Sequence, residues 1–172
     1  MKRMPLIIFS LLCAIYQTAL ANSSATATMH VSLEVLKSCT LQANDLNFAS
    51  HGSDEASEIN ATTQLSVLCT NGTPFTLSAA SSDSESDSES DSESDGTFWL
   101  KPEDTSINAQ NIAYRLYADE SKKTPVNANG GIEGTGTGQA QSETLVGVIE
   151  AGALNNAKAG LYSDNVTLNL VY

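Results

Sequence analysis

The chain has 172 residues, and its 20 acidic and 8 basic side chains give a net charge of −12. This excess of carboxylates argues against nucleic acid or an anionic membrane as a partner, because both repel an acidic surface. Hydrophobic residues make up 41% of the chain, which suits one domain with a substantial core.

The first 21 residues have the pattern of a secretory signal peptide. Lys2 and Arg3 precede an apolar run at 6–14, and Ala19-Leu20-Ala21 supplies small residues for cleavage. The apolar run is shorter than the roughly 20 residues that a membrane-spanning helix needs. We expect residues 1–21 to be removed, which leaves six basic and 20 acidic residues and a net charge of −14.

After this site, apolar and polar residues alternate with the period of a β-strand. The apolar row is Ala25, Ala27, Met29, Val31, Leu33 and Val35. An exposed apolar strand is an aggregation liability, so we expect the row to be buried in a neighbouring molecule. The part before Leu33, about residues 22–32, is the expected donor segment.

Two cysteines, Cys39 and Cys69, remain once Cys13 has left with the signal peptide. An even pair in an exported chain predicts one disulfide. A redox or metal-binding role is disfavoured, because no CxxC spacing or nearby histidine accompanies the pair.

The next segments read as short strands separated by turns. Cys39-Thr40-Leu41 and Leu46-Asn47-Phe48 flank a turn, and residues 59–69 form the next strand with Cys69 facing inward. The turn at 71–74 leads into a returning strand at 75–79. These two strands are therefore predicted to form a β-hairpin.

An acidic repeat occupies residues 81–95. From Asp83 onward, serine alternates with seven carboxylates, and no apolar residue interrupts the run. Self-repulsion and the lack of apolar surface predict a disordered, solvated loop. Weak calcium binding is the alternative, but the spacing and the glycine of an EF-hand are absent, so no metal site is predicted.

Further strands are expected at 97–100, 112–118, 144–149 and 161–172. The glycine-rich stretch at 127–138 is predicted to be a flexible loop, because its Gly-Thr repeat lacks the lysine of a phosphate-binding loop and leads into a strand. No segment has a sustained helical period. Seven or eight short strands predict an all-β fold, an antiparallel β-sandwich of immunoglobulin-like type.

The last predicted strand turns one apolar row toward the core: Val166, Leu168, Leu170 and Tyr172. The strand can pair with an earlier strand on one side, but no later segment of the chain covers its other side. We expect a groove at this strand, which the first strand of another molecule fills.

No arrangement typical of an enzyme is found. A catalytic site needs a nucleophile with a base, paired carboxylates in a cleft, or a metal cluster. The exported chain has only His30 and His51, both predicted to be surface residues without a role. No cofactor is predicted. Trp99, Tyr114 and Tyr117 could stack on a sugar, although core packing is the commoner use of strand aromatics.

Short motifs, in this order, resemble the spore coat protein U domain family, which includes pilus subunits of archaic chaperone-usher systems. They are Ser38-Cys39-Thr40, Leu46-Asn47-Phe48, residues 65–75, residues 114–119, Gly134-Thr135-Gly136, residues 146–149 and residues 159–164. Two features depart from the family. Ala49 stands where members often have glycine, and the acidic repeat replaces a short glycine-rich connection.

The resemblance implies that residues 22–172 form one incomplete immunoglobulin-like antiparallel β-sandwich, which is completed by a donated strand. A periplasmic chaperone would donate first, followed by the N-terminal extension of the next subunit at the outer-membrane usher. Such head-to-tail contacts do not close, so they generate a fibre. The implied function is a structural subunit of a homopolymeric pilus, secreted through the periplasm to the cell surface, that supports adhesion or biofilm formation.

Two other functions stay open at this point. One is a secreted monomeric sandwich that binds a ligand, with Trp99 as the candidate glycan contact. The other is a coat protein that assembles laterally without forming a fibre. Size under native conditions separates these functions, because a donor-strand fibre gives an SDS-resistant ladder when unheated and a monomer does not.

Overall fold

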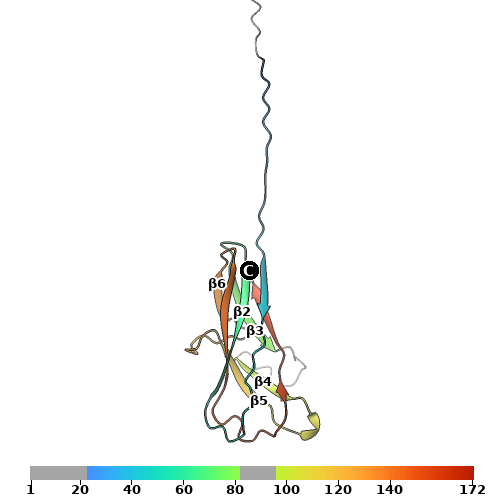
Figure 1. Ribbon diagram of the computed structural model, residues 1–172, viewed down its shortest axis with the longest axis vertical. Coiled ribbons are helices and arrows are strands. Elements are labelled where there is room, and N and C mark those ends of the chain that lie inside the picture. Colours follow the sequence, from blue (N-terminus) through green and yellow to red (C-terminus); the bar gives the residue numbers. More distant parts are fainter. Residues whose placement is uncertain (1–22, 82–95) are drawn as a thin grey trace, which may run out of the picture. The chain divides into compact units, whose positions relative to one another are not determined.

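The computed structural model describes residues 23–81 and 96–172 (Figure 1). The expected signal peptide and nearly all of the acidic repeat lie outside the described residues, so the expectations for them stay predictions. The chain divides between Glu34 and Val35 into two units. All the strands described below belong to the second unit.

The described residues form nine β-strands and one short 3-10 helix. The elements are β1 (Cys39–Ala43), β2 (Ile59–Cys69), β3 (Pro74–Ser81), β4 (Thr97–Pro102), η1 (Thr105–Ile107), β5 (Ile112–Tyr117), β6 (Ile132–Thr135), β7 (Ala140–Ile149), β8 (Tyr162–Ser163) and β9 (Val166–Val171). No described segment forms a helix long and apolar enough to cross a membrane.

The strands form two antiparallel sheets. The larger sheet has six strands in the order β1-β2-β7-β5-β4-β8, and the smaller sheet has three in the order β6-β3-β9. Both sheets contribute to one hydrophobic core. The expected all-β, immunoglobulin-like sandwich is confirmed. β1 lies at an edge of the larger sheet and β9 at an edge of the smaller one.

Period-2 alternation explains how the core forms. Along β2, buried and solvent-facing residues alternate, and Leu65, Val67 and Cys69 all point inward. β3 contributes Leu77 and Ala79, which are completely buried. Each strand thus removes one apolar row from water and leaves its polar row outside.

The predicted hairpin between β2 and β3 is wrong, because these strands belong to different sheets. Both edges of β2 are already paired, one with β1 and the other with β7. The turn therefore carries the chain across the sandwich. Its ends are held by hydrogen bonds from the Thr73 N–H to the Thr70 carbonyl and from the Gly72 N–H to the Gly136 carbonyl, at 3.0 and 2.8 Å.

The glycine-rich stretch is also more ordered than predicted. It contains β6, which pairs with β3. Beyond β6, the Gly136 N–H donates to the Thr73 carbonyl at 2.7 Å. A Cβ atom at Gly136 would lie 2.6 Å from the Cβ of Cys69 and 2.6 Å from the carbonyl oxygen of Thr70. Glycine is needed here for close packing, and the stretch is not a free loop.

The predicted last strand, 161–172, is in fact two strands. β8 pairs with β4 in the larger sheet, whereas β9 pairs with β3 in the smaller one. The chain changes sheets at Asp164 and Asn165. Two other segments expected to be strands, residues 23–36 and Leu46-Asn47-Phe48, are not in β-structure. A period-2 pattern indicates which face would be buried, but it supplies no partner strand.

Candidate functional site

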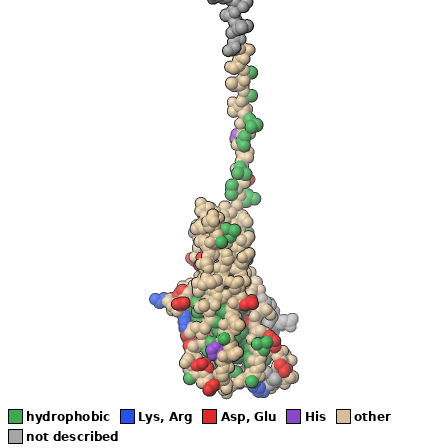
Figure 2. Space-filling model, in the orientation of Figure 1, with side chains coloured by type: hydrophobic (Ala, Val, Ile, Leu, Met, Phe, Trp, Pro, Cys, Tyr) green, Lys and Arg blue, Asp and Glu red, His purple; other side chains and the backbone are tan. Residues whose placement is uncertain are grey.

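The N-terminal segment carries an apolar row that lacks a partner strand among the described residues. Ala25, Ala27, Met29 and Val31, the predicted donor residues, are all exposed, and none belongs to a sheet. Met29 is 81% and Val31 is 76% exposed. Figure 2 shows hydrophobic side chains spaced along this extended segment. Its sequence has the pattern of a half-buried strand, and its apolar face is open to solvent.

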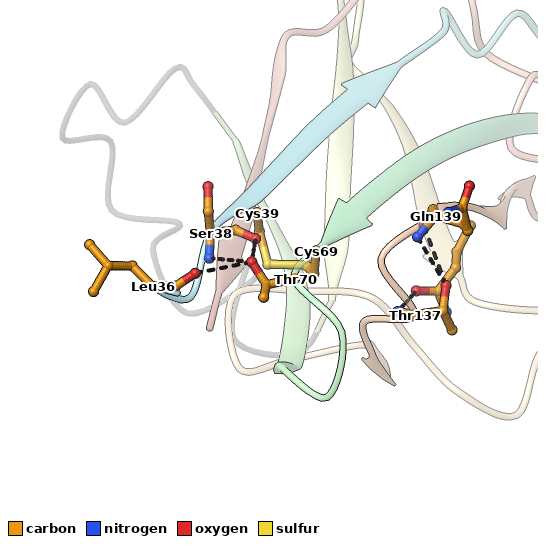
Figure 3. Close-up of a disulfide and its surroundings, with 8 residues drawn as sticks. Leu36, Ser38, Cys39, Cys69, Thr70, Thr137 and Gln139 are labelled. Atoms are coloured by element: carbon orange, nitrogen blue, oxygen red, sulfur yellow. Dashed lines mark hydrogen bonds between the residues drawn. A yellow bond between two sulfur atoms is a disulfide. The ribbon is translucent and has the colours of Figure 1, made fainter. Parts of the chain in front are cut away.

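The disulfide between Cys39 and Cys69 is present, as the cysteine count predicted (Figure 3). The two cysteines lie directly opposite each other in the β1–β2 ladder. Cys69 is buried in the core, and Cys39 packs against it from the edge strand. The bridge therefore ties the start of β1 to the end of β2.

β9 is incompletely covered. Val166, Leu168 and Leu170 pack against the core, yet all three are only half-buried. Their neighbours Leu77 and Ala79 on β3, which lie opposite Leu170 and Leu168, are completely buried. β9 pairs with β3 on one side and with no described strand on the other. Tyr172, the last predicted groove residue, follows the strand and is 53% exposed.

A cavity of about 540 Å³ opens between the end of β1 and the start of β9. One wall comes from residues 43–48 and the other from residues 164–168. Its inner side chains belong to the core strands: Leu65, Leu100, Tyr114, Leu116 and Leu145. The cavity thus gives access to the apolar core between the edges of the two sheets. Asn44, Asp45, Asp164 and Asn165 add polar groups to its lining.

In the first wall of the cavity, the Leu46-Asn47-Phe48 segment packs closely against β7. A Cβ atom at Gly147 would lie 2.7 Å from both Leu46 and Phe48, so these side chains occupy the space that Gly147 leaves open. The Phe48 ring also meets the Tyr114 ring edge-on, with centroids 5.8 Å apart. The Leu46-Asn47-Phe48 segment therefore forms a wall of the cavity.

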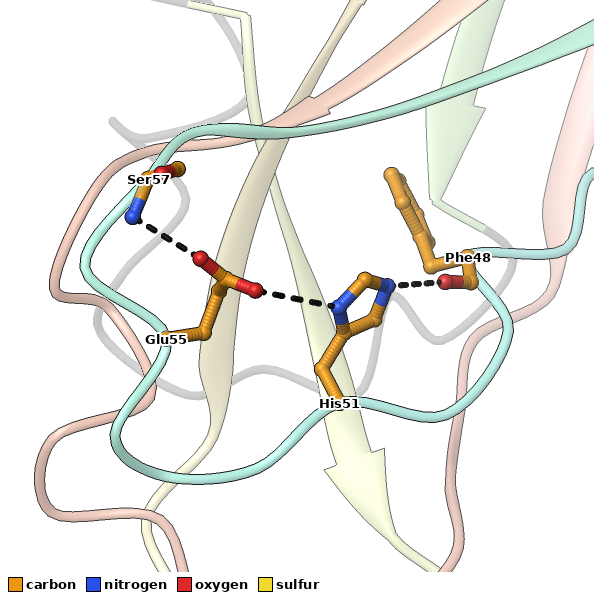
Figure 4. Close-up of polar contacts among 4 residues, drawn as sticks. All are labelled: Phe48, His51, Glu55 and Ser57. Atoms are coloured by element: carbon orange, nitrogen blue, oxygen red, sulfur yellow. Dashed lines mark hydrogen bonds and ion pairs between the residues drawn. The ribbon is translucent and has the colours of Figure 1, made fainter.

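His51 contacts the loop that carries Phe48 (Figure 4). Its Nε2 atom donates a hydrogen bond to the carbonyl oxygen of Phe48, at 2.7 Å. Its Nδ1 atom lies 3.8 Å from a Glu55 carboxylate oxygen, and the other oxygen of Glu55 accepts from the Ser57 N–H at 3.1 Å. His51 was predicted to have no role, but its contacts stabilise the loop that places Phe48.

The second wall is joined to the core by Tyr114. The Tyr114 hydroxyl donates to a carboxylate oxygen of Asp164 at 2.6 Å. This bond links β5 to the point where the chain changes sheets before β9. Burial of the phenol, with the Asp164 carboxylate beside it, raises the pKa of Tyr114 above its ordinary value. The hydroxyl is therefore held in its neutral, hydrogen-bonding form.

Tyr114 does not belong to the sugar-stacking platform considered from the sequence. Tyr114 lies opposite Phe98 on the core side of the larger sheet, with ring centroids 5.5 Å apart. Trp99 follows Phe98 and therefore points to the other face. Trp99 and Tyr114 do not share a surface. Within residues 23–81 and 96–172, no group of three or more His, Cys, Asp and Glu side chains is placed to hold a metal ion.

Leu46, Phe48 and Asp164 stood out in the sequence only as parts of motifs, and Tyr114 stood out as part of a motif and as a candidate sugar contact. Nothing in the sequence placed these residues around one site. Tyr114 and Asp164 are 50 positions apart, and only the tertiary structure brings them together. The signal available was their occurrence inside three separate family motifs. Side chains that wall a cavity need no local periodicity, so periodicity could not reveal them.

These features define a class of protein: an all-β sandwich with an open cavity between two edge strands and an unpartnered apolar segment. The family model for the Spore Coat Protein U domain matches residues 25–169. The chain belongs to this family. Comparison with curated protein sequences finds no match.

A solved structure shares the fold. One similar chain is in the CsuC-CsuE chaperone-tip adhesion subunit pre-assembly complex from archaic chaperone-usher Csu pili of Acinetobacter baumannii, with a TM-score of 0.54 and 17% identity. The match covers 80% of this chain and 40% of that chain. The P pilus rod subunit PapA is also similar, with a TM-score of 0.48 and 12% identity over 78% of this chain and 98% of that one.

Proposed function

We propose that this protein is a structural subunit of a secreted surface pilus, assembled by donor-strand complementation, and not an enzyme. Residues 1–21 direct export and are removed, and residues 22–172 form the pilin domain. The donor segment, about residues 22–32, enters the cavity of the next copy of the chain. The product is a homopolymeric fibre that supports adhesion or biofilm formation at the cell surface.

One observation carries this proposal: a cavity reaching the core lies between β1 and β9, each the edge strand of its sheet among the described residues, in a chain with an exposed apolar row. A strand laid along such an edge gains main-chain hydrogen bonds, and its alternate side chains enter the cavity. Donation would therefore cover the half-buried face of β9 and the exposed row together. Both would otherwise be sites of aggregation.

The proposed assembly route follows from the need to cover the open cavity at every stage. Before polymerisation, the open cavity requires a temporary strand, which we assign to a periplasmic chaperone, and an outer-membrane usher exchanges that strand for the next subunit. The family membership and the fold shared with a chain of a chaperone–subunit complex of Csu pili support this route. The strongly acidic composition gives no basis for nucleic acid as a further partner.

A charge in the apolar row tests the proposal. Val31→Asp would place an unpaired carboxylate in the cavity, at a cost of about 3 to 5 kcal/mol. A loss of this size lowers subunit–subunit affinity at least 100-fold. We expect Val31→Asp subunits to stay bound to chaperone but to form no SDS-resistant ladder, because the chaperone fills the cavity with its own strand.

Ser32→Asp is the matched control. It introduces the same charge one residue along, on the face that points away from the cavity, and should leave the ladder intact. A synthetic peptide covering residues 22–36 should also bind the open cavity of the Val31→Asp subunit. At 100 times its dissociation constant the peptide would stabilise the subunit by about 2.7 kcal/mol, a rise of roughly 5 to 10 °C in Tm.

If Val31→Asp subunits polymerise like the wild type and the peptide leaves Tm unchanged, strand donation is excluded. A wild-type chain that stays monomeric after release from chaperone would instead favour a ligand-binding module. Lateral sheets without a ladder would favour a coat protein.

A further inference from the structure

The residues that join the donor segment to the sandwich are held by one residue, Thr70, through its main chain and its hydroxyl. Thr70 is the first residue after β2, and Ser38 immediately precedes β1. The Thr70 N–H donates to the Ser38 carbonyl at 2.9 Å, and the Ser38 N–H donates to Thr70 Oγ1 at 3.1 Å. The Thr70 hydroxyl in turn lies 3.2 Å from the Leu36 carbonyl and 3.4 Å from the Ser38 carbonyl, either of which can accept its proton. Figure 3 shows these bonds beside the disulfide.

Packing does not explain why residues 36–38 are held. The side chains of Val35 and Leu36 are 72% and 69% exposed, so they bury little apolar surface. The Cys39–Cys69 disulfide fixes the chain only from Cys39 onward. The hydrogen bonds of Thr70 extend this attachment by three residues toward the N-terminus. The chain divides into its two units immediately before Val35.

We propose that Thr70 is a positioning residue for strand donation, which fixes residues 36–38 to the sandwich and confines the joint between successive subunits to residues 34 and 35. The donated segment then ends by Leu33. This inference rests on the proposed function and deepens it, because it names the residue that sets the joint. Without the Thr70 hydroxyl, the main-chain bond from the Thr70 N–H would still hold Ser38, and the joint would lengthen by two residues, or about 7 Å of extended chain.

The consequence is mechanical. A joint of two residues allows few relative orientations of neighbouring subunits, whereas a joint of four samples many more conformations. Thr70 should therefore stiffen the fibre without taking part in the donor–cavity contact. A residue that merely stabilised the fold would change the melting temperature of the subunit and leave fibre stiffness unaltered.

The test compares fibres of the full mature chain carrying Thr70→Val or Thr70→Ser with wild-type fibres. Valine keeps the size of threonine but lacks the hydroxyl, and serine keeps the hydroxyl. Electron micrographs should show at least a twofold fall in persistence length for Thr70→Val and none for Thr70→Ser. Hydrogen exchange of the Ser38 amide should accelerate at least tenfold in Thr70→Val alone.

In case Thr70→Val fails to fold, a second pair of variants changes Ser38, the other partner in the hydrogen bond to the Thr70 hydroxyl. Ser38→Pro removes the N–H that donates to Thr70, and Ser38→Ala keeps it, so only the proline variant should loosen the fibre. Wild-type stiffness in Thr70→Val fibres, or in Ser38→Pro fibres if the valine variant does not fold, would overturn this inference alone. Failure of the wild-type chain to form fibres would overturn the proposed function and this inference with it.

Discussion

Ala49 adopts a backbone conformation that suits glycine better than alanine. Its φ angle is +65°, in the left-handed region, directly after Phe48 in the cavity wall. The Ala49 N–H is satisfied by the side-chain oxygen of Asn47 at 2.7 Å, which helps to fix the turn. This geometry gives a physical reason for the glycine that family members often carry at this position, because glycine adopts positive φ without steric cost.

Ala49→Gly should therefore stabilise the subunit. Relief of left-handed strain is worth about 1 to 2 kcal/mol, and the greater unfolded-state freedom of glycine offsets about 0.4 to 1 kcal/mol of it. We expect a net gain of roughly 0.5 to 1 kcal/mol in urea unfolding of the monomeric subunit. Destabilisation by Ala49→Gly would mean that the left-handed turn is not present in solution.

Tyr114 predicts a specific pH dependence. The folded state raises its pKa above the ordinary value of about 10, so folding favours the neutral phenol. The contribution of Tyr114 to stability is thus complete below pH 10 and is lost as the pH rises through the raised folded-state pKa. Unfolding free energy should fall more steeply above pH 10 in the wild type than in Tyr114→Phe.

At neutral pH, Tyr114→Phe removes the hydrogen bond to Asp164 and should cost about 1.5 to 3 kcal/mol. Urea titrations of both proteins between pH 7 and pH 11 measure both effects. Parallel pH profiles for the two proteins would show that the Tyr114 hydroxyl is ionised as easily in the folded as in the unfolded chain.

At the scale of elements, the residues after strand β6 stabilise the β2–β3 turn, where the chain passes from the larger sheet to the smaller one. Gly136 exchanges hydrogen bonds with both sides of the β2–β3 turn, and its backbone lies against Cys69. The turn carries the chain from β2 in the larger sheet to β3 in the smaller one, so its packing helps to fix this crossing. The same turn region includes Thr70, which is hydrogen-bonded to Ser38, between the donor segment and β1.

Gly136→Ala should destabilise the subunit by roughly 1 to 3 kcal/mol, because the added methyl group would overlap backbone and disulfide atoms that cannot move freely. Gly52→Ala is the control. Its methyl group would meet chiefly the flexible carboxylate of Asp54 and should change stability by less than about 0.5 kcal/mol. Equal effects of the two variants in urea unfolding would contradict the close packing at Gly136.

At the scale of the whole molecule, charge works against assembly. With residues 1–21 removed, the subunit has a net charge of −14, and neighbouring copies in a homopolymer repel one another. The acidic repeat contributes seven of these charges and connects β3 of one sheet to β4 of the other. In the proposed fibre, apolar burial along the donor segment must exceed this repulsion, which salt screens.

Replacing the acidic repeat with a Gly-Ser linker of equal length should preserve folding and assembly and lower the net negative charge by seven. Polymerisation should become faster at low salt and less dependent on salt, because the screened repulsion is smaller. Rates from light scattering at several salt concentrations measure the change. Loss of assembly, or a calcium-dependent rise in Tm that vanishes with the repeat, would assign the repeat a role beyond a solvated loop.

Several features could be predicted because they depend on local chemistry. The alternation along residues 59–69 determined a strand and its inward face, and the cysteine count determined the Cys39–Cys69 bridge. Ordered motifs indicated the family. Each of these conclusions needs only the residues themselves and their spacing.

Only the tertiary structure decided which strands are neighbours. The pattern of β2 and β3 suits a hairpin as well as a crossing between sheets, and β2 has no free edge because β1 and β7 occupy both. Likewise, the break at Asp164 and Asn165 follows from β8 and β9 pairing with strands in different sheets. Periodicity specifies the buried face of a strand, but its neighbours, and therefore the cavity beside β9, depend on long-range pairing and packing.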